Sequence, residues 1–86
     1  MNVLLPSNLA GYTDQRHRVA ASGATLAEAL EDLDRRHPGI RFRIVSEQDR
    51  IRRHIKIFIN GDQADGLEAP LAADDEIMIV CALSGG

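Results

Sequence analysis

The sequence predicts one small α+β domain, in which a mixed sheet of four to five strands packs on one main helix. Three observations predict it: a well-capped amphipathic helix, strand-like apolar segments on both sides of that helix, and a length of 86 residues. Because domains usually span roughly 100–200 residues, the chain has room for only one. Apolar residues make up 44% of it, which is enough for one thin core.

The predicted sheet begins with two short strands. Residues 2–5 form an apolar run that Pro6 ends, and residues 7–15 are rich in turn-forming residues. Residues 17–21 are the second expected strand, which can pair back on the first as a hairpin, and Gly23 ends it.

The helix is predicted by a capping box and an apolar stripe. Thr25 can accept a hydrogen bond from the backbone N–H three residues on, and Glu28 can reach back. The apolar residues on one helical face are Leu26, Leu30 and Leu33. Two pairs of opposite charge are spaced i,i+4: Glu31 with Arg35 and Asp32 with Arg36. The sequence 37–39, His-Pro-Gly, ends the helix because the residue before proline avoids the α region.

The second half of the chain contains the remaining strands. Residues 40–53 fit a short strand or a short helical turn at their start, and 46–53 are polar enough for an exposed loop. Residues 54–59 alternate with period two and lead into Asn60-Gly61, a strong tight-turn dipeptide. Residues 76–82 are the last strand, after a polar connection. A right-handed crossover would set the first strand parallel to the last, which is the β-grasp arrangement.

Composition excludes several classes of protein. The net charge of −3 and only three aromatic residues argue against a nucleic-acid-binding or base-stacking surface. The single cysteine, Cys81, excludes an intrachain disulfide or an iron–sulfur cluster with four cysteine ligands. The N-terminus lacks the features of a signal peptide, and no apolar run approaches a membrane span. We therefore expect a cytoplasmic, soluble protein with no membrane and no nucleic-acid partner.

No catalytic constellation or bound cofactor is expected. His17, His37 and His54 lack a metal-binding spacing and are expected at the surface or as caps, and we expect no metal site. The acidic run 74–76 is interpreted as a solvated turn, with a divalent-metal site as a minor alternative. The alternation of Cys81 with Ile77 and Ile79 predicts a buried, inert thiol, with a reactive thiol five residues from the terminus as the minor alternative.

Charge is unevenly distributed along the chain. Eight of the ten basic residues lie between Arg35 and Lys56, whereas residues 57–86 carry six acids and no Lys or Arg. Two interpretations are open: ordinary solvation of the helix and loops, or an acidic C-terminal half that steers docking onto a basic partner.

The alternation of the strands also predicts an apolar patch. Phe58, Met78 and Val80 lie opposite the isoleucines, on the face that the helix does not cover, and Leu4 or Leu5 can join them, with Leu5 as our candidate. Exposed contiguous apolar surface usually marks a partner site. The alternative is that residues 40–53 cover this face.

The C-terminus is the most specific feature. Gly85 and Gly86 follow the last strand after a short Leu83-Ser84 stem, and two terminal glycines arise by chance in roughly 0.5% of chains. We expect residues 1–82 to form the domain and 83–86 a flexible tail. Glycine has no side chain, so such a tail can thread a narrow channel and present the Gly86 carboxylate to an enzyme. Simple fraying of a terminus is the alternative.

With these motifs in this order, the sequence resembles the ubiquitin-like sulfur-carrier family over nearly its whole length. The matching segments are 24–26, 37–39, 57–61, 70–71, 74–77 and 85–86, together with Leu30 and Leu33. Family members often end in Ala-Gly-Gly, and Ser84 stands here in place of that alanine. The resemblance implies that the chain is not an enzyme, although it could be the small subunit of a synthase complex.

The resemblance also implies the chemistry and the partners. An adenylating enzyme related to ubiquitin-activating enzymes would use ATP to activate Gly86, and a sulfur donor would then convert it to a thiocarboxylate. The acceptor would be the large subunit of molybdopterin synthase or a cysteine synthase-like enzyme. Segment lengths favour the cysteine pathway, with molybdopterin close behind and thiamine third. Two other functions remain open: a modifier joined to lysines through Gly86, and a non-reactive ubiquitin-like binding module.

Overall fold

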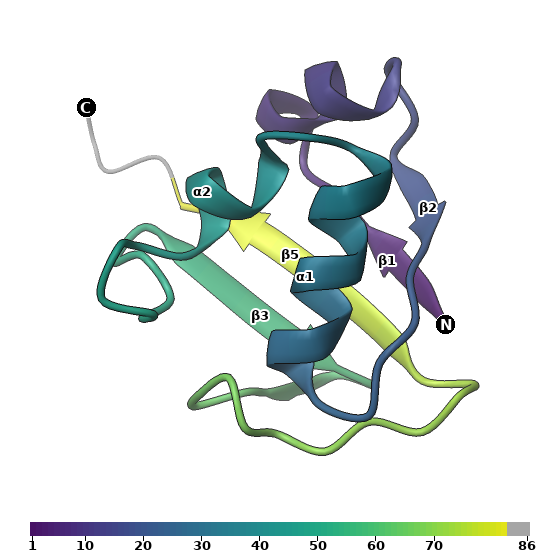
Figure 1. Ribbon diagram of the computed structural model, residues 1–86, viewed down its shortest axis with the longest axis vertical. Helices are drawn as coiled ribbons and strands as arrows, with labels where there is room; N and C mark the ends of the chain where they lie inside the picture. The colour runs from purple at the N-terminus through teal and green to yellow at the C-terminus, as the bar shows by residue number, and fades with distance from the viewer. Residues whose placement is uncertain (83–86) are drawn as a thin grey trace.

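The computed structural model describes residues 1–82 and has the predicted α+β architecture (Figure 1). Its elements are β1 (Asn2–Leu4), the 3-10 helix η1 (Ser7–Thr13), β2 (Arg18–Ala20), α1 (Leu26–Arg36), α2 (Ile40–Ile44), β3 (Ile55–Ile59), β4 (Asp62–Gln63) and β5 (Glu76–Cys81). The strands form one sheet in the order β2-β1-β5-β3-β4. β1 and β5 are parallel, as predicted, and the other neighbours are antiparallel. This is the β-grasp.

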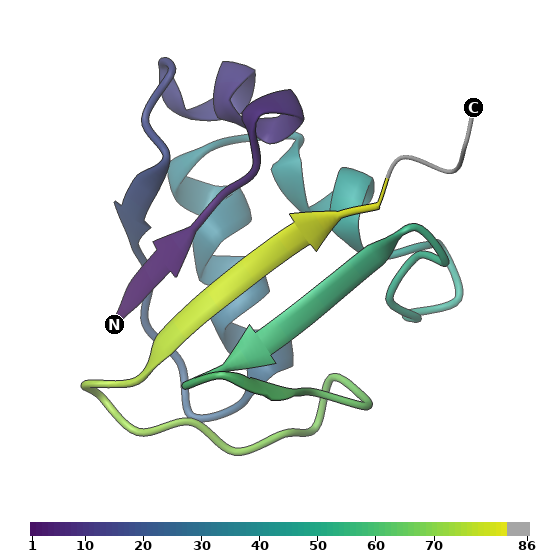
Figure 2. The ribbon, with the colours of Figure 1, turned by 180° about the vertical axis from the view of Figure 1, so that it is seen from behind.

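The sheet has one covered and one open face. α1 crosses the covered face (Figure 1), and the view from behind shows the strands of the other face with no helix of the described residues over them (Figure 2). The core lies between α1 and the sheet. Its largest fully buried side chains are Leu26, Leu30, Leu33, Ile40, Ile44, Ile57, Ile77, Ile79, Val3, Val45 and Thr13. The predicted leucine stripe and the inward isoleucines of β3 and β5 are therefore confirmed, with Ile59 only partly buried.

The N-terminus of α1 is capped nearly as predicted. Thr25 Oγ1 accepts a hydrogen bond from the Glu28 N–H at 3.3 Å. The Glu28 carboxylate reaches one residue further back than a standard capping box and accepts from the Ala24 N–H at 2.9 Å. The next two orphan N–H groups, of Leu26 and Ala27, donate to carbonyls of the 64–75 connection at 2.9 and 2.8 Å. The cap thus also anchors that long connection beside the helix.

The charge pairs on α1 differ in part from the prediction. Asp32 and Arg36 are paired at 2.8 Å as expected, but Arg35 turns to the same Asp32 at 3.0 Å instead of pairing with Glu31. Asp32 also accepts from the Ser22 N–H at 2.9 Å, and this bond, ahead of the two arginines, lowers the pKa of the Asp32 carboxyl. The Asp32 carboxylate therefore accepts hydrogen bonds from three groups and connects the β2–α1 loop to the helix.

Residues 40–53 adopt the helical alternative at their start. Gly39 has φ 98°, a left-handed conformation that favours glycine, and it lets α2 begin at once after α1. Ile40 and Ile44 of α2 are buried in the core. The loop that follows is closed by a single bridge between Val45 and Ile51 and is mostly exposed, as predicted.

The predicted turn after β3 is also confirmed. Asn60 and Gly61 have φ 50° and 89°, the two positive values that a tight hairpin turn of this dipeptide requires. The turn leads into β4, which pairs with the end of β3. None of the helices in residues 1–82 has the length and apolar character needed to cross a bilayer.

Candidate functional site

The site predicted from the sequence has two parts, and the structure describes one of them. The tail residues Leu83, Ser84, Gly85 and Gly86 lie outside the described residues. The described chain leads toward them along β5, which ends at Cys81, and the Ala82 N–H then donates to the His54 carbonyl at 2.7 Å. The last described residue is therefore held beside the start of β3.

The second part is an apolar patch on the open face of the sheet, and the strand registers bring it together. Leu4 pairs with Met78 across the parallel β1–β5 ladder, and Met78 pairs with Phe58 across the antiparallel β5–β3 ladder. These three residues form a row across three strands, and Val80 lies two residues along β5 on the same face. We call Leu4, Phe58, Met78 and Val80 the open-face patch.

The patch is accessible, and α2 does not cover it. Met78 is 42% exposed and Val80 36%, whereas Phe58 and Leu4 are partly buried by their neighbours. The alternative that residues 40–53 cover this face is wrong, because Ile40 and Ile44 pack into the core on the α1 side. An uncovered apolar surface is available for a partner.

The placement of Leu5 on this face was wrong. Leu5 is only 5% exposed and belongs to the core, because side chains alternate along β1 and Val3, two residues earlier, also points inward. Its N–H donates to the His17 carbonyl at 2.8 Å, which continues the β1–β2 pairing by one residue. Leu4 takes the expected place. The run 2–5 gave no alternation that could have separated the two leucines, and only the pairing with β5 does so.

Charged side chains border the patch. Arg18 of β2 and Glu76 of β5 form an ion pair at 3.5 Å, with side chains 58% and 46% exposed. On the other side Lys56 is exposed and pairs in register with Val80. An apolar centre with a charged border is the usual composition of a protein-binding surface.

Cys81 is less buried than expected. It is a free thiol of intermediate exposure, and the Asn8 side-chain N–H contacts its Sγ at 2.9 Å. This contact joins the end of β5 to η1. The expected inward side is correct, because Cys81 packs against the core, but the thiol is only partly buried since Cys81 is the last residue of β5.

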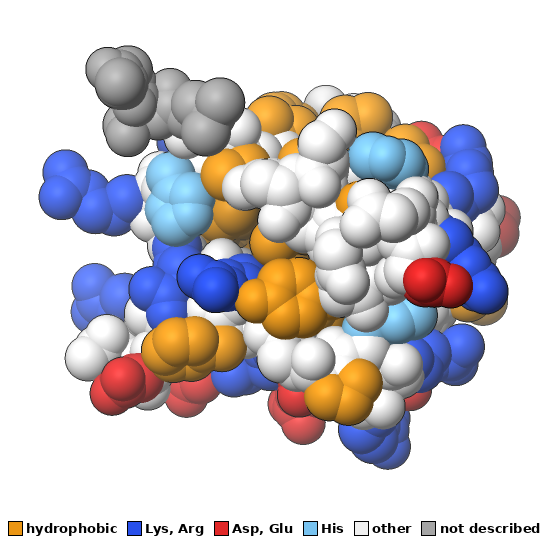
Figure 3. Space-filling model, turned by 90° about the horizontal axis from the view of Figure 1, so that it is seen from above, with side chains coloured by type: hydrophobic (Ala, Val, Ile, Leu, Met, Phe, Trp, Pro, Cys, Tyr) orange, Lys and Arg blue, Asp and Glu red, His pale blue; other side chains and the backbone are white. Residues whose placement is uncertain are grey.

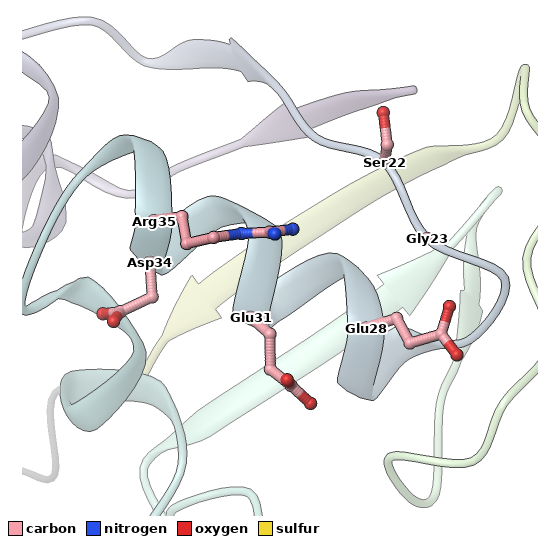
Figure 4. Close-up of a pocket in the computed structure, with 6 residues that line it drawn as sticks. All are labelled: Ser22, Gly23, Glu28, Glu31, Asp34 and Arg35. Carbon is pink, nitrogen blue, oxygen red and sulfur yellow. The ribbon is translucent and has the colours of Figure 1, made fainter.

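Several acidic side chains on and around α1 serve structural roles. A hollow on the α1 surface is lined by Ser22, Gly23, Glu28, Glu31, Asp34 and Arg35, and its carboxylates point in different directions (Figure 4). Asp34 accepts from the N–H groups of Gly39 and Arg41, at 3.1 and 3.0 Å, so it shapes the α1–α2 turn. Within residues 1–82 no group of three or more His, Cys, Asp or Glu side chains is arranged to hold a metal ion.

The acidic run before β5 forms a turn, as predicted. Asp75 accepts from the Ala72 N–H and from the Asn60 side chain, both at 2.8 Å. These two donors, the backbone N–H first, lower the pKa of the Asp75 carboxyl. Asn60 in turn accepts from the Glu76 N–H at 3.0 Å, so the turn and the β3–β4 hairpin are fastened to each other.

A β-grasp sheet with an open apolar face, in a sequence whose last strand is followed within a few residues by Gly-Gly, defines a ubiquitin-like carrier protein. The chain belongs to the ThiS family, whose model matches residues 3–86. This is the ubiquitin-like sulfur-carrier family that the sequence resembles, and its members act as carriers and not as catalysts.

Individual relatives agree with this assignment over their full lengths. The sulfur carrier protein CysO of Mycobacterium tuberculosis is 30% identical over 91 residues, which cover 100% of this chain and 98% of the relative. A chain of the BexX/CysO complex of Amycolatopsis orientalis is 34% identical with a TM-score of 0.91, covering 99% of this chain and 98% of that one. SAMP1 of Haloferax volcanii is 33% identical with a TM-score of 0.79, covering 100% and 98%.

Proposed function

We propose that this protein carries sulfur as a thiocarboxylate on Gly86 and delivers it in cysteine biosynthesis. The observation that carries the proposal is the full-length similarity to the CysO sulfur carriers, in a chain that itself ends in Gly85-Gly86. The same similarity favours the cysteine branch over molybdopterin and thiamine. A cytoplasmic location, expected from the N-terminal sequence, stays a prediction.

The chemistry requires two steps on the terminal carboxylate. A carboxylate is a poor electrophile, so its oxygen first attacks the α-phosphorus of ATP, which releases pyrophosphate and leaves an acyl-adenylate. A sulfide or persulfide sulfur then attacks the acyl carbon and displaces AMP; where a persulfide attacks, reduction of its S–S bond frees the thiocarboxylate. An adenylating enzyme supplies this chemistry, and the present chain supplies the acyl group and needs no bound cofactor of its own.

The described residues support the partner-binding half of this cycle. The open-face patch offers a docking surface on the sheet whose central strand leads to the tail. A structure of a CysO in complex with BexX indicates that a close structural relative assembles with another protein. We propose two partners in turn: the adenylating enzyme, and a cysteine synthase-like enzyme that accepts the sulfur.

Intact-mass spectrometry tests the proposal directly. The protein is incubated with the adenylating enzyme of its own host, ATP and a sulfur donor, and one oxygen should be exchanged for one sulfur. A variant that lacks Gly86 is the control and should keep its mass. An unchanged mass of the full-length protein, with an enzyme that is active on its own ATP substrate, would sink the proposal.

A modifier function is the second candidate, because SAMP1, a small archaeal modifier protein, is 33% identical over the whole chain. In this case lysine amines would attack the same acyl-adenylate and form isopeptide bonds. Immunoblots of cell lysate should then show high-mass adducts that vanish on deletion of Gly86. If cellular function survives deletion of Gly85 and Gly86, both candidates fail and a non-reactive binding module remains.

A further inference from the structure

A cluster of exposed cations lies beside the place where the described chain ends. Residues 41–56 carry six basic side chains and two acids, a net charge of +4. Within residues 1–82 the one ion pair of this segment joins Arg41 and Asp49 at 3.2 Å. The remaining cations, which we call the basic cluster, are Arg43, Arg50, Arg52, Arg53 and Lys56. Most of this positive charge is therefore not neutralised by the described residues.

Backbone contacts fix the position of the cluster. Ile55 pairs with Cys81, and the His54 carbonyl accepts from the Ala82 N–H at 2.7 Å, so Arg53 and Lys56 flank the two residues that pair with the end of the described chain. Figure 3 looks onto this end of the molecule and shows one group of Lys and Arg side chains on the side of the α2–β3 connection and a second group on the opposite side. The chain thus leaves β5 beside a basic surface.

Five of the six acids of residues 57–86 lie at the opposite end of the same strand. Glu76 begins β5 and Cys81 ends it, and six residues of strand span about 20 Å. Asp74 and Asp75 directly precede Glu76, and Asp62 and Glu68 line one hollow with Ile59 at the end of β3, so these four acids lie at that far end (Figure 2). The sixth acid, Asp65, also lines a hollow together with Arg52, Arg53 and Lys56. An acidic C-terminal half that steers docking onto a basic partner would therefore act mainly from the end of β5 that is farther from Ala82, whereas basic side chains lie beside Ala82.

Because the tail is short, an enzyme that acts on Gly86 must come close to the basic cluster. Residues 83–86 can extend at most about 14 Å beyond Ala82. An enzyme that acts on the Gly86 carboxylate therefore comes close to the surface around Ala82, which includes Arg53 and Lys56. Lys56 also pairs with Val80, so the basic cluster is continuous with the open-face patch.

We propose that the basic cluster docks on an acidic surface that borders the tail entrance of the adenylating enzyme. This inference rests on the proposed function and adds to it the charge of the partner. The cations are largely exposed, so they act mainly by steering encounter, whereas the open-face patch supplies apolar contact. The surface that contacts the adenylating enzyme would thus have two parts: the apolar open-face patch on the sheet, and the basic cluster at the end of β5.

A charge-reversal pair tests this inference. In the R53E/K56E variant both side chains are exposed and make no ion pair within residues 1–82, so the fold should be retained. The control is R16E/R35E, which changes the net charge equally but lies before β2 and on α1; because Arg35 pairs with Asp32 at 3.0 Å, urea unfolding checks that this control is as stable as R53E/K56E. With ATP and a sulfur donor present, AMP release by the host's adenylating enzyme is measured against carrier concentration, at low and high salt.

We expect R53E/K56E to lower kcat/KM at low salt by about tenfold or more, with kcat at saturating carrier unchanged and a flatter salt dependence. R16E/R35E should resemble the wild type. Equal effects of both pairs, or no effect of either, overturn the inference while the proposed function stands. No activation of the wild type overturns both.

A nucleic-acid partner is the competing outcome for a basic surface. Fluorescence anisotropy with a labelled single-stranded RNA separates it from an acidic protein. If R53E/K56E abolishes RNA binding and leaves kcat/KM unchanged, the cluster serves nucleic acid and the inference is overturned. Weak RNA binding, equal in both variants, agrees with an acidic protein surface as the partner.

Discussion

The two faces of β5 differ in burial although their residues alternate along one strand. Ile77 and Ile79 are 0% and 2% exposed beneath α1, whereas Met78 and Val80 are 42% and 36% exposed on the other side. Both sets are apolar, so hydrophobicity alone does not separate them. The difference is the covering: α1 of the same chain packs on one face, and no described helix packs on the other, which we propose as the docking face. Stability and recognition should therefore respond to different residues of the same strand.

The largest expected effect comes from breaking the covered face. Ile77→Ala removes buried methyl groups and leaves a cavity against α1, so it should cost about 2–5 kcal/mol of the free energy of unfolding. Met78→Ala, one residue along, should cost less than about 1 kcal/mol, because its side chain already contacts water. Urea unfolding followed by circular dichroism measures both. Equal losses would contradict the division between the faces.

The next effect comes from breaking the open face. Met78→Glu places a charge at the centre of the open-face patch and should lower kcat/KM for activation of Gly86 about tenfold or more, since central apolar contacts dominate interfaces. Gln63→Glu adds the same charge on the same face, opposite Phe58 but on the outer strand, and should have little effect. Both variants should unfold at nearly the urea concentration of the wild type. A loss of activation in Gln63→Glu alone would relocate the docking surface.

The sequence predicted the covered face well because local chemistry and packing agree there. The cap at Thr25, the proline stop and the period-two strands each act over a few residues, and the leucine stripe has one way to be buried. The segment 40–44 was ambiguous because Ile40 and Ile44 share a face in both a strand and a helix. Only Phe42 separates the two, and its 56% exposure shows the helical solution, with Arg52 stacked over its ring at 4.6 Å.

The open face was predicted less completely because its composition depends on register. Phe58, Met78 and Val80 followed from alternation, but the choice between Leu4 and Leu5 depended on pairing with a strand more than seventy positions away. The position of the basic cluster likewise could not follow from the order of charges along the sequence. The acids of residues 57–86 are nearer to the tail in sequence, but the pairing of β5 with β3 places the basic cluster nearer to Ala82 in space. Long-range contacts, and not local propensity, set both features.

A smaller loss of stability is expected when the hydrogen bond that caps the N-terminus of α1 is removed. Thr25→Ala removes the acceptor for the Glu28 N–H and should destabilise the protein by about 1 kcal/mol. Thr25→Ser keeps the hydroxyl and should restore most of that stability in the same thermal unfolding experiment. If serine is as damaging as alanine, the methyl group of Thr25 and not its hydrogen bond stabilises the helix start.

The smallest effect is expected at the turn before β5, and it depends on pH. The Ala72 N–H and the Asn60 side chain lower the folded-state pKa of Asp75 below its ordinary value of 3.8. A carboxyl whose pKa is lower when folded stabilises the protein above its unfolded pKa, and this stabilisation is lost as the pH falls through the folded pKa. Wild-type stability should therefore decline as the pH drops from near 3.8 downward.

Asp75→Asn removes the titrating group and keeps one acceptor at the turn, so it should lower stability at neutral pH and flatten the decline in acid. Asp74→Asn is the matched control, since the Asp74 carboxylate makes no hydrogen bond within residues 1–82 and its side chain is exposed. Urea midpoints measured from neutral to strongly acidic pH compare the three proteins. Should Asp74→Asn flatten the profile as much as Asp75→Asn, general charge repulsion in the acidic run, and not the Asp75 hydrogen bonds, would explain the acid sensitivity at this end of the sheet.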